Sequence, residues 1–447
     1  MVKDLTRGSV GRLLLLYSLP LFFSNLFQQV YSIADSVIAG RYAGNDALAA
    51  VGASYPITMI FIAVAIGSNI GCGIVISQLF GARDYKKMKT AISTSMLSVA
   101  ALSVVFTVLG LSLYRQMLAL LGTPDNIFAD AALYLKIYIC GVFFLFFYNI
   151  CTGIFSALGD SRTPLMFLII SSVGNVILDV VFVKYCHWGV AGVAVATLMA
   201  QGASAVAAFF VLLRRLRGIP TEGKYPLFSF SMLKKVSYVS IPGILQQSFM
   251  SVGNLFVQNL VNGFGEDVIA GFSAAMKLNN LATTSLLAFG NGVSGFTAQN
   301  IGAGERERVR RGYHMGILMA EVLALLLAVL YFVGREPLII AFLDTSGAGA
   351  GIVESGARFL KTVAPFFVVL GIKQVSDGVI KGAGSMKQFM AATLTDLIVR
   401  VALSYLLVGK LGYMGIWISW PIGWFVGTGL SVLFYRMGTW KKGLDLN

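Results

Sequence analysis

Residues 78–82 read Gln-Leu-Phe-Gly-Ala, and residues 299–303 read Gln-Asn-Ile-Gly-Ala. Each of these segments ends a long apolar run and is followed by a basic loop. Outward from this pair, Ser-Leu-Pro at 18–20 corresponds to Ser-Ile-Pro at 240–242 at nearly the same offset. The chain therefore contains the same apolar module twice.

The composition indicates a membrane protein. Hydrophobic residues make up 57% of the 447 residues, charged residues make up 12%, and the mean hydropathy is +0.79. A water-soluble domain usually carries about a quarter of charged residues. Apolar runs of about 18 residues or more can cross a bilayer as helices, and we predict about twelve of them. Their approximate limits are 13–40, 48–80, 90–113, 132–157, 165–186, 190–213, 238–262, 268–301, 313–334, 358–381, 389–408 and 414–436.

An even number of crossings in each copy gives both copies the same orientation in the membrane, so they are related by an axis along the membrane normal. We therefore predict an all-α membrane protein with two pseudo-twofold-related six-helix lobes around a central cavity. The N-lobe is expected at 1–213, a cytoplasmic linker at 214–237 and the C-lobe at 238–447.

The positive charge is distributed unevenly along the chain. The formal net charge is +14, and most of the 34 lysines and arginines fall in the terminal tails and in the loops on the same side of the predicted bilayer. Such a bias places both termini in the cytoplasm and the multi-pass chain in the plasma membrane. The basic residues form no continuous face, so we expect no nucleic acid as a partner. We expect membrane lipids and small organic substrates as partners, and a monomer.

The first helix of each copy carries a polar stripe with steps of four, three and four residues, which is one helical face. The positions are Asn25, Gln29, Ser32 and Ser36 in the first copy and Gln247, Ser251, Asn254 and Gln258 in the second. Lipid cannot satisfy an amide, so these faces should look toward protein or water. They either join neighbouring helices or line a substrate cavity between the lobes, and their matching positions favour the cavity.

Two acids, Asp35 and Asp179, lie within apolar runs of the N-lobe and have no acidic counterparts in the second copy. A carboxylate at the bilayer centre costs roughly 2.5–3.5 kcal/mol, so it should be protonated, paired or bound to a cation. Asn175 lies one turn before Asp179, and Thr197 is expected at a similar depth. Their oxygens are hard ligands that suit H⁺ or Na⁺. The alternative is a permanently protonated pair that only joins helices.

The C-lobe contains buried positive charge as well. Two pairs are spaced by four residues, Lys373 with Asp377 and Asp396 with Arg400. Each pair could be neutralised within its own helix. Lys277 and Glu321 have no such local partner. Lys277, Lys373 and Arg400 therefore either form internal ion pairs or contact substrate.

The sequence offers no Walker A lysine motif, no His-Glu-x-x-His motif and no cysteine spacing typical of metal sites. We therefore expect no enzyme activity, no cofactor other than a coupling ion, and no metal beyond a possible Na⁺ at Asp35 and Asp179.

Over essentially its full length, the chain resembles the multidrug and toxic compound extrusion (MATE) family of cation-coupled antiporters. The resemblance rests on the two six-helix lobes, the Gln-x-x-Gly-Ala ends, Pro20 and Asp35 on the first helix, and Asn175-x-x-x-Asp179 on the fifth. It implies that the first helix bends at Pro20 when the site changes occupancy. The N-lobe cation site that it implies consists of Asp35, Asn175, Asp179 and Thr197, with Asn149 as a weaker candidate.

Family members with an acidic sodium site in the C-lobe carry a glutamate on the seventh helix, and none stands near Met250. The chain therefore resembles the branch that uses an N-lobe aspartate and protons. The resemblance implies secondary active multidrug efflux, in which H⁺ or Na⁺ is exchanged for amphipathic organic compounds by alternating access. The buried cations of the C-lobe leave the charge of the substrate open. A lipid-linked precursor flippase of the same superfamily is the alternative, and a channel is a further one.

Overall fold

The computed structural model describes residues 3–38, 40, 42, 44–221, 223–341 and 349–444, without the side chains of 33–38, 45 and 46. Throughout these ranges the chain forms helices and connecting turns and contains no strand, which confirms the all-α class. The α-helices are α1 (Val10–Ile38), α2 (Asn45–Gly81), α3 (Tyr85–Leu120), α4 (Asp125–Cys140), α5 (Val142–Ala157), α6 (Arg162–Asp179), α7 (Gly189–Arg217), α8 (Phe230–Val261), α9 (Glu266–Gly302), α10 (Arg306–Val333), α11 (Arg335–Ala341), α12 (Ala350–Val363), α13 (Phe367–Gly382), α14 (Met386–Leu411) and α15 (Tyr413–Arg436).

Each predicted apolar run coincides with one helix or with two successive helices. Among the described residues, nine helical spans are long and apolar enough to cross a membrane, or ten if α4 and α5 form one span bent by 47°. Helices α8 and α9 contain 32 and 37 residues and are also long enough, although they are more polar. The run predicted at 358–381 comprises the end of α12 and α13, which a short 3₁₀ turn joins.

The chain divides into two compact units. The first unit chiefly contains Phe23–Leu245, and the second chiefly contains Leu5–Phe22 and Gln246–Asp445. The divisions therefore fall inside α1 and α8, a few residues after Pro20 and Pro242. The two units therefore do not coincide with the two copies of the repeat. The opening part of the first helix of each copy belongs to the unit that contains the rest of the other copy.

Close glycine contacts hold these opening parts in place. Within the first unit, a Cβ added to Gly71 of α2 would lie 1.9 Å from the Ser240 hydroxyl oxygen of α8. Within the second unit, a Cβ added to Gly292 of α9 would lie 1.9 Å from the Ser18 hydroxyl oxygen of α1. The two contacts join repeat-equivalent residues, since Gly71 corresponds to Gly292 and Ser18 to Ser240. Only glycine lets the helices approach so closely.

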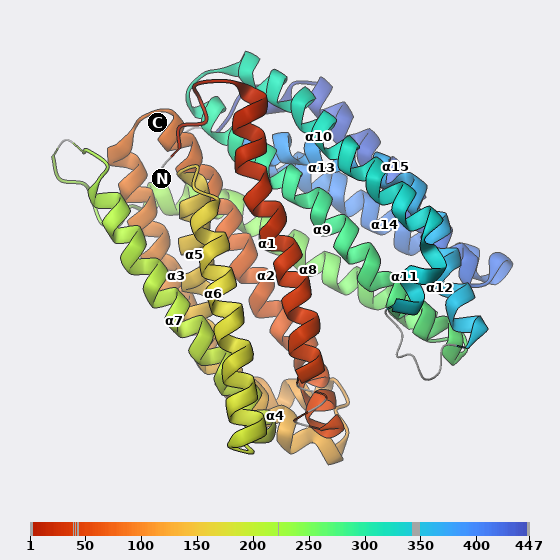
Figure 1. Ribbon diagram of the computed structural model, residues 1–447. Helices are drawn as coiled ribbons and strands as arrows, with labels where there is room; N and C mark the ends of the chain where they lie inside the picture. The colour runs from red at the N-terminus through yellow and green to blue at the C-terminus, as the bar shows by residue number, and fades with distance from the viewer. Residues whose placement is uncertain are drawn as a thin grey trace. The chain divides into compact units, whose positions relative to one another are not determined.

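In the first unit, α5 packs against α2, α3 and α7, and α7 also contacts α4 and α6. Figure 1 shows α5, α6 and α7 running alongside one another. The bend between α4 and α5 lies at Gly141, where an added Cβ would meet Leu198 at 2.9 Å. Fully buried Phe146 and Phe155 of α5 fill the space between these helices.

In the second unit, α9 packs against α10, α12 and α13, and α15 packs against α14 and α13 (Figure 1). The aromatic part of its core lies between α9, α12 and α15. Phe272 stacks on Trp417 with a centroid distance of 4.9 Å, and Phe359 meets the same indole edge-on at 5.2 Å. Such ring pairs prefer one geometry, so they fix α15 relative to α9 and α12.

Candidate functional site

Asp179, a buried acid of the first unit, lies where a helix changes its winding. Asp179 is the last residue of α6, and the chain continues as a π-helix over Val180–Tyr185. π-helical turns are rare in proteins, and many of those that occur lie at functional sites. Asp179 is 1% exposed and Asn175 is 2% exposed, and the two lie one turn apart on one face of α6.

The Asn175 amide joins three helices of the first unit. In the orientation that satisfies its neighbours, its nitrogen donates to Asp179 Oδ2 at 3.2 Å and to the Tyr31 hydroxyl oxygen, and its oxygen accepts from the backbone N–H of Thr197 at 3.1 Å. Three predicted residues, Asn175, Asp179 and Thr197, therefore lie together. The Thr197 hydroxyl donates instead to the Val193 carbonyl of its own helix, at 3.0 Å.

Tyr31 is the member of this cluster that the sequence reasoning missed. It lies on α1 one turn before Asp35, beside the polar stripe. A phenol hydroxyl within an apolar run needs a hydrogen-bond partner, and that need was the available signal. We name Tyr31, Asn175, Asp179 and Thr197 the α6 cluster.

The structure does not add the other predicted residues to the α6 cluster. Asp35 and Ser36 belong to α1, but their side chains lie outside the described residues, so the pairing of Asp35 with Asp179 stays a prediction. Pro20 lies inside α1, which runs from Val10 to Ile38 as one helix. The Asn149 amide donates to the Leu145 carbonyl of its own helix at 2.8 Å.

The polar stripes lie on α1 and α8, as their spacing predicted. Asn25, Gln29, Gln247, Ser251 and Gln258 are half-buried, and Ser32 and Asn254 are exposed. On α8, the Ser251 hydroxyl donates to the Gln247 carbonyl at 3.1 Å, and the Gln258 amide donates to Asn262 Oδ1 at 2.8 Å. That the two stripes line one substrate cavity stays a prediction.

The second unit contains a charged cluster buried between α13, α14 and α15. Lys373 Nζ lies 2.8 Å from Asp377 Oδ2, the partner expected from the spacing, and 3.7 Å from Asp396 Oδ2. Asp377 Oδ1 also accepts a hydrogen bond from the Ser431 hydroxyl at 2.5 Å. Together with Arg400, one turn beyond Asp396, these charged residues form what we name the buried quartet: Lys373, Asp377, Asp396 and Arg400.

The spacing of Asp396 and Arg400, which could have neutralised the two charges within α14, does not lead to a salt bridge. No ion pair within 4.0 Å joins them in the described part of the chain, and Asp396 lies beside Lys373 of the neighbouring helix instead. Arg400 places its guanidinium carbon 4.2 Å from the centroid of the Trp420 ring and donates to Asn254 Oδ1 at 3.4 Å. The indole face attracts the cation, so a contact between helices replaces the contact within the helix.

Two glycines of α15 make room for the quartet. A Cβ added to Gly427 would lie 2.7 Å from Lys373 Cε and 2.8 Å from Asp396 Cβ. A Cβ added to Gly423, one turn earlier, would lie 2.7 Å from Asp396 Oδ1. Small residues at this spacing let membrane helices approach closely, so α15 determines how tightly the charges are enclosed.

The remaining charged candidates of the second unit are separate from the quartet. Lys277 lies on α9 and is exposed. Glu321 lies on α10, where its Oε1 atom is buried and has no hydrogen-bond partner in the described structure. A Cβ added to Gly371 of α13 would lie 2.7 Å from that oxygen, so Glu321 points toward α13.

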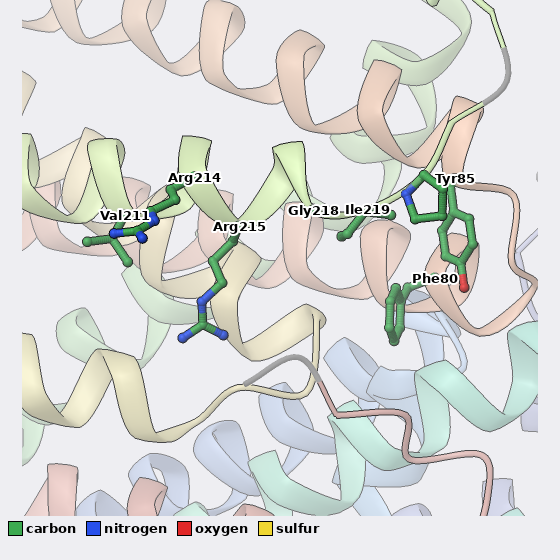
Figure 2. A pocket seen from close by; sticks show the side chains of 8 residues that line it. Phe80, Tyr85, Val211, Arg214, Arg215, Gly218 and Ile219 are labelled. Atoms are coloured by element: carbon green, nitrogen blue, oxygen red, sulfur yellow. The ribbon is translucent and has the colours of Figure 1, made fainter.

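A pocket of about 770 Å³ lies in the first unit, away from the predicted site residues. Arg214 and Arg215 line it from the end of α7, and Phe80 of α2 and Tyr85 of α3 line it as well (Figure 2). Arg215 is already paired with Asp160 at 2.8 Å. We assign no transport role to this pocket.

A comparison with models of protein families shows to which family this chain belongs. The MatE family model matches residues 20–181 and again residues 242–406, so each match begins at the repeated proline and the two together cover most of the chain. The chain belongs to the MatE family. The family consists of multi-pass membrane transporters, which agrees with the apolar helices of this MatE protein.

The probable multidrug resistance protein YpnP of Bacillus subtilis is 30% identical over 439 residues, which are 98% of this chain and 97% of that protein. The probable multidrug resistance protein NorM of Thermotoga maritima is 23% identical over 432 residues, or 95% and 92% of the two chains. A relative from Shewanella oneidensis, named an FAD transporter, is 22% identical over 75% of each chain.

Solved structures share the fold. An outward-facing MATE family transporter of the MOP superfamily superposes with a TM-score of 0.91 at 24% identity, covering 97% of both chains. A MOP superfamily transporter from Pyrococcus furiosus, whose binding pocket is described as having reverse polarity, superposes with a TM-score of 0.89 at 24% identity, covering 98% of this chain and 97% of that one. The two-lobe helical architecture predicted from the internal repeat is therefore confirmed.

Proposed function

We propose that this MatE protein is a secondary active multidrug efflux transporter that exchanges H⁺, or Na⁺, for amphipathic organic compounds by alternating access. Relatives that match nearly the whole chain are named multidrug resistance proteins. We further propose that the coupling ion binds in the first unit at Asp179 together with Asp35, and that the protein acts in the plasma membrane with both termini in the cytoplasm.

The observation that carries the proposal is the position of Asp179 in the α6 cluster. Its carboxylate is 1% exposed and accepts from the Asn175 amide, which also contacts Tyr31 of α1 and the backbone of α7. When the carboxylate gains a proton, an oxygen that accepted hydrogen bonds can donate one. A proton on Oδ2 removes the acceptor of the Asn175 amide and rearranges its contacts, so ion binding at that oxygen alters the hydrogen bonds that tie α1 to α6.

Helix α1 is suited to respond to such a change. Pro20 removes one backbone donor from the helix and weakens it at that turn, and the helix passes from the second unit to the first a few residues later. An ion that binds one conformation of α1 better than another shifts the population by its differential affinity. We propose that this shift opens the substrate site to the other side of the membrane.

The test uses purified protein in liposomes, with a pH gradient and a Na⁺ gradient imposed separately. We expect a wild-type transporter to accumulate an organic cation dye under one of these gradients. Asp179→Asn should still bind the dye in detergent but should lose gradient-driven transport by at least about tenfold, because the amide cannot exchange a proton. The control is Asp125→Asn at the exposed start of α4, which should transport normally.

A second variant separates coupling from general damage. Tyr31→Phe removes only the hydroxyl that contacts Asn175, so it should keep dye binding and shift the pH dependence of transport. Full gradient-driven transport by Asp179→Asn would refute the assignment of the ion site. An anionic dye and a fluorescent lipid in the same liposomes test the charge of the substrate and the flippase alternative.

A further inference from the structure

The second unit contains a buried positive charge, the Lys373 ammonium, that is covalently attached to the chain. We propose that Lys373 is a tethered cation that fills, between Asp377 and Asp396, a site that would otherwise bind a free metal cation, so that the second unit keeps a constant charge during transport. This inference rests on the proposed transport function, because it leaves ion exchange to the carboxylates of the first unit.

The geometry around Lys373 is that of an occupied cation site. Its ammonium lies 2.8 Å from Asp377 Oδ2 and 3.7 Å from Asp396 Oδ2, and its residue is only 4% exposed. The second oxygen of Asp377 accepts from the Ser431 hydroxyl at 2.5 Å. Two carboxylates, one from α13 and one from α14, therefore converge on one positive charge, and Ser431 of α15 holds the second oxygen of Asp377.

The two carboxylates are of the kind that a small hard cation binds. Carboxylate oxygens coordinate Na⁺-like and Ca²⁺-like ions, whereas an ammonium satisfies the same oxygens through its hydrogen bonds. The quartet as a whole is electrically balanced, because Lys373 and Arg400 offset Asp377 and Asp396. A buried group without net charge has little electrostatic tendency to recruit a further ion.

The ammonium is fixed by its surroundings. Its side chain passes Gly427, where even one added carbon would come within 2.7 Å of Lys373 Cε. Asp377 lies on the same helix as Lys373 one turn later, so this pair moves with α13 as a body. A free ion could exchange with either side of the membrane, whereas this charge remains in place when the protein changes conformation.

The same contacts separate the roles of the two bases of the quartet. Arg400 contacts Trp420 and Asn254, and no ion pair within 4.0 Å joins it to an acid in the described chain. Asp396 has one oxygen near Lys373, and its other oxygen is buried without a hydrogen-bond partner among the described residues. Removing the Lys373 charge would therefore leave two carboxylates facing one unfilled space.

The test is a gain of ion binding. In Lys373→Met the side chain keeps most of its length but loses its charge. We expect this variant to bind one additional ²²Na⁺ per protein molecule at equilibrium in detergent, compared with the wild type. The variant should also show an apparent melting temperature that rises with Na⁺ concentration, because a ligand that binds only the folded state stabilises it.

The matched control is the double variant Lys373→Met/Asp396→Asn, which removes one positive and one negative charge and keeps the cluster balanced. It should bind no more ²²Na⁺ than the wild type, and it should transport with the same number of ions per substrate. The double variant still tests the inference if Lys373→Met fails to fold. A changed ion-to-substrate ratio in the double variant would overturn the inference, and so would equal ²²Na⁺ binding by the wild type and a folded Lys373→Met.

These results are distinct from a failure of the proposed transport function. Ion binding is measured at equilibrium and needs no transport. A wild type without any gradient-driven transport would refute the function. A wild type that couples normally, with a folded Lys373→Met that gains no ion, would refute only the tethered cation.

Discussion

Asp160 gives the sharpest test of how the first unit is held together outside the membrane. Its carboxylate lies 2.8 Å from Arg215 Nη1 and accepts from the backbone N–H of Thr163 at 3.1 Å and from the Thr163 hydroxyl at 2.8 Å. The acidic side chain is 2% exposed, and that of Arg215 is 27% exposed. This one carboxylate thus joins the start of α6 to the end of α7.

The cost of Asp160→Ala follows from these contacts. Loss of a side-chain bond to a helix N-terminus costs about 1 kcal/mol, and loss of a hydrogen bond to a charged group costs about 1.5–3 kcal/mol. Water can partly replace the carboxylate at Arg215, so the lower end applies and the total is about 2–3 kcal/mol. With about 2–4 °C per kcal/mol for a unit of this size, the apparent melting temperature should fall by about 4–12 °C.

The pH dependence supplies a second, independent check. Burial raises the pKa of Asp160, but the hydrogen bonds from Thr163 and the charge of Arg215 outweigh burial, so the pKa lies below its ordinary value. A carboxyl whose folded pKa is lowered stabilises the fold above its unfolded pKa of about 3.9, and this contribution is lost as the pH falls through the folded pKa. The difference between wild type and variant should therefore stay constant from about pH 5 to 8 and shrink only in acid.

The assay is thermal unfolding of purified protein in detergent, followed by tryptophan fluorescence or by aggregation. Asp125→Ala, which removes an exposed acid from the first turn of α4, is the matched control and should change the melting temperature little. If Asp160→Ala melts like the wild type at pH 7, or if the difference disappears between pH 8 and 6, the reasoning from the ion pair is refuted.

Two glycine substitutions test the close helix contacts. Gly427→Ala should destabilise the second unit by about 1–3 kcal/mol through overpacking against the quartet, whereas Gly429→Ala, which meets nothing within 4 Å on the same helix, should be neutral or slightly stabilising in a melting assay. Gly71→Ala should likewise lower the melting temperature, because the new carbon would collide with Ser240, and Gly52→Ala, which meets nothing within 4 Å on α2, is its control. If a variant and its control have the same melting temperature, the close packing inferred at that glycine is contradicted.

The helical spans were predictable because the property that defines them is local. An apolar run of sufficient length must form a helix in a bilayer, whatever surrounds it. The short breaks were not predictable. The bend at Gly141 and the π-helical turn after Asp179 depend on neighbouring helices, which the hydropathy of the run does not report.

The candidate sites divide in the same way. The spacing of Asn175 and Asp179 and that of Lys373 and Asp377 predicted contacts within one helix, and both contacts are present. Tyr31 joins the α6 cluster from another helix, so its place was not visible in the spacing.

The sequence by itself determined the all-α class, the duplication and the position of charged residues within apolar runs, since periodicity and length act within each helix. Only the tertiary structure decided the partners of those charges and the contacts between helices. Asp396 lies near Lys373 rather than Arg400, and Ser18 contacts Gly292 of the other copy. The reason is that a helix determines which of its residues share a face, whereas the close packing of neighbouring helices determines what that face meets.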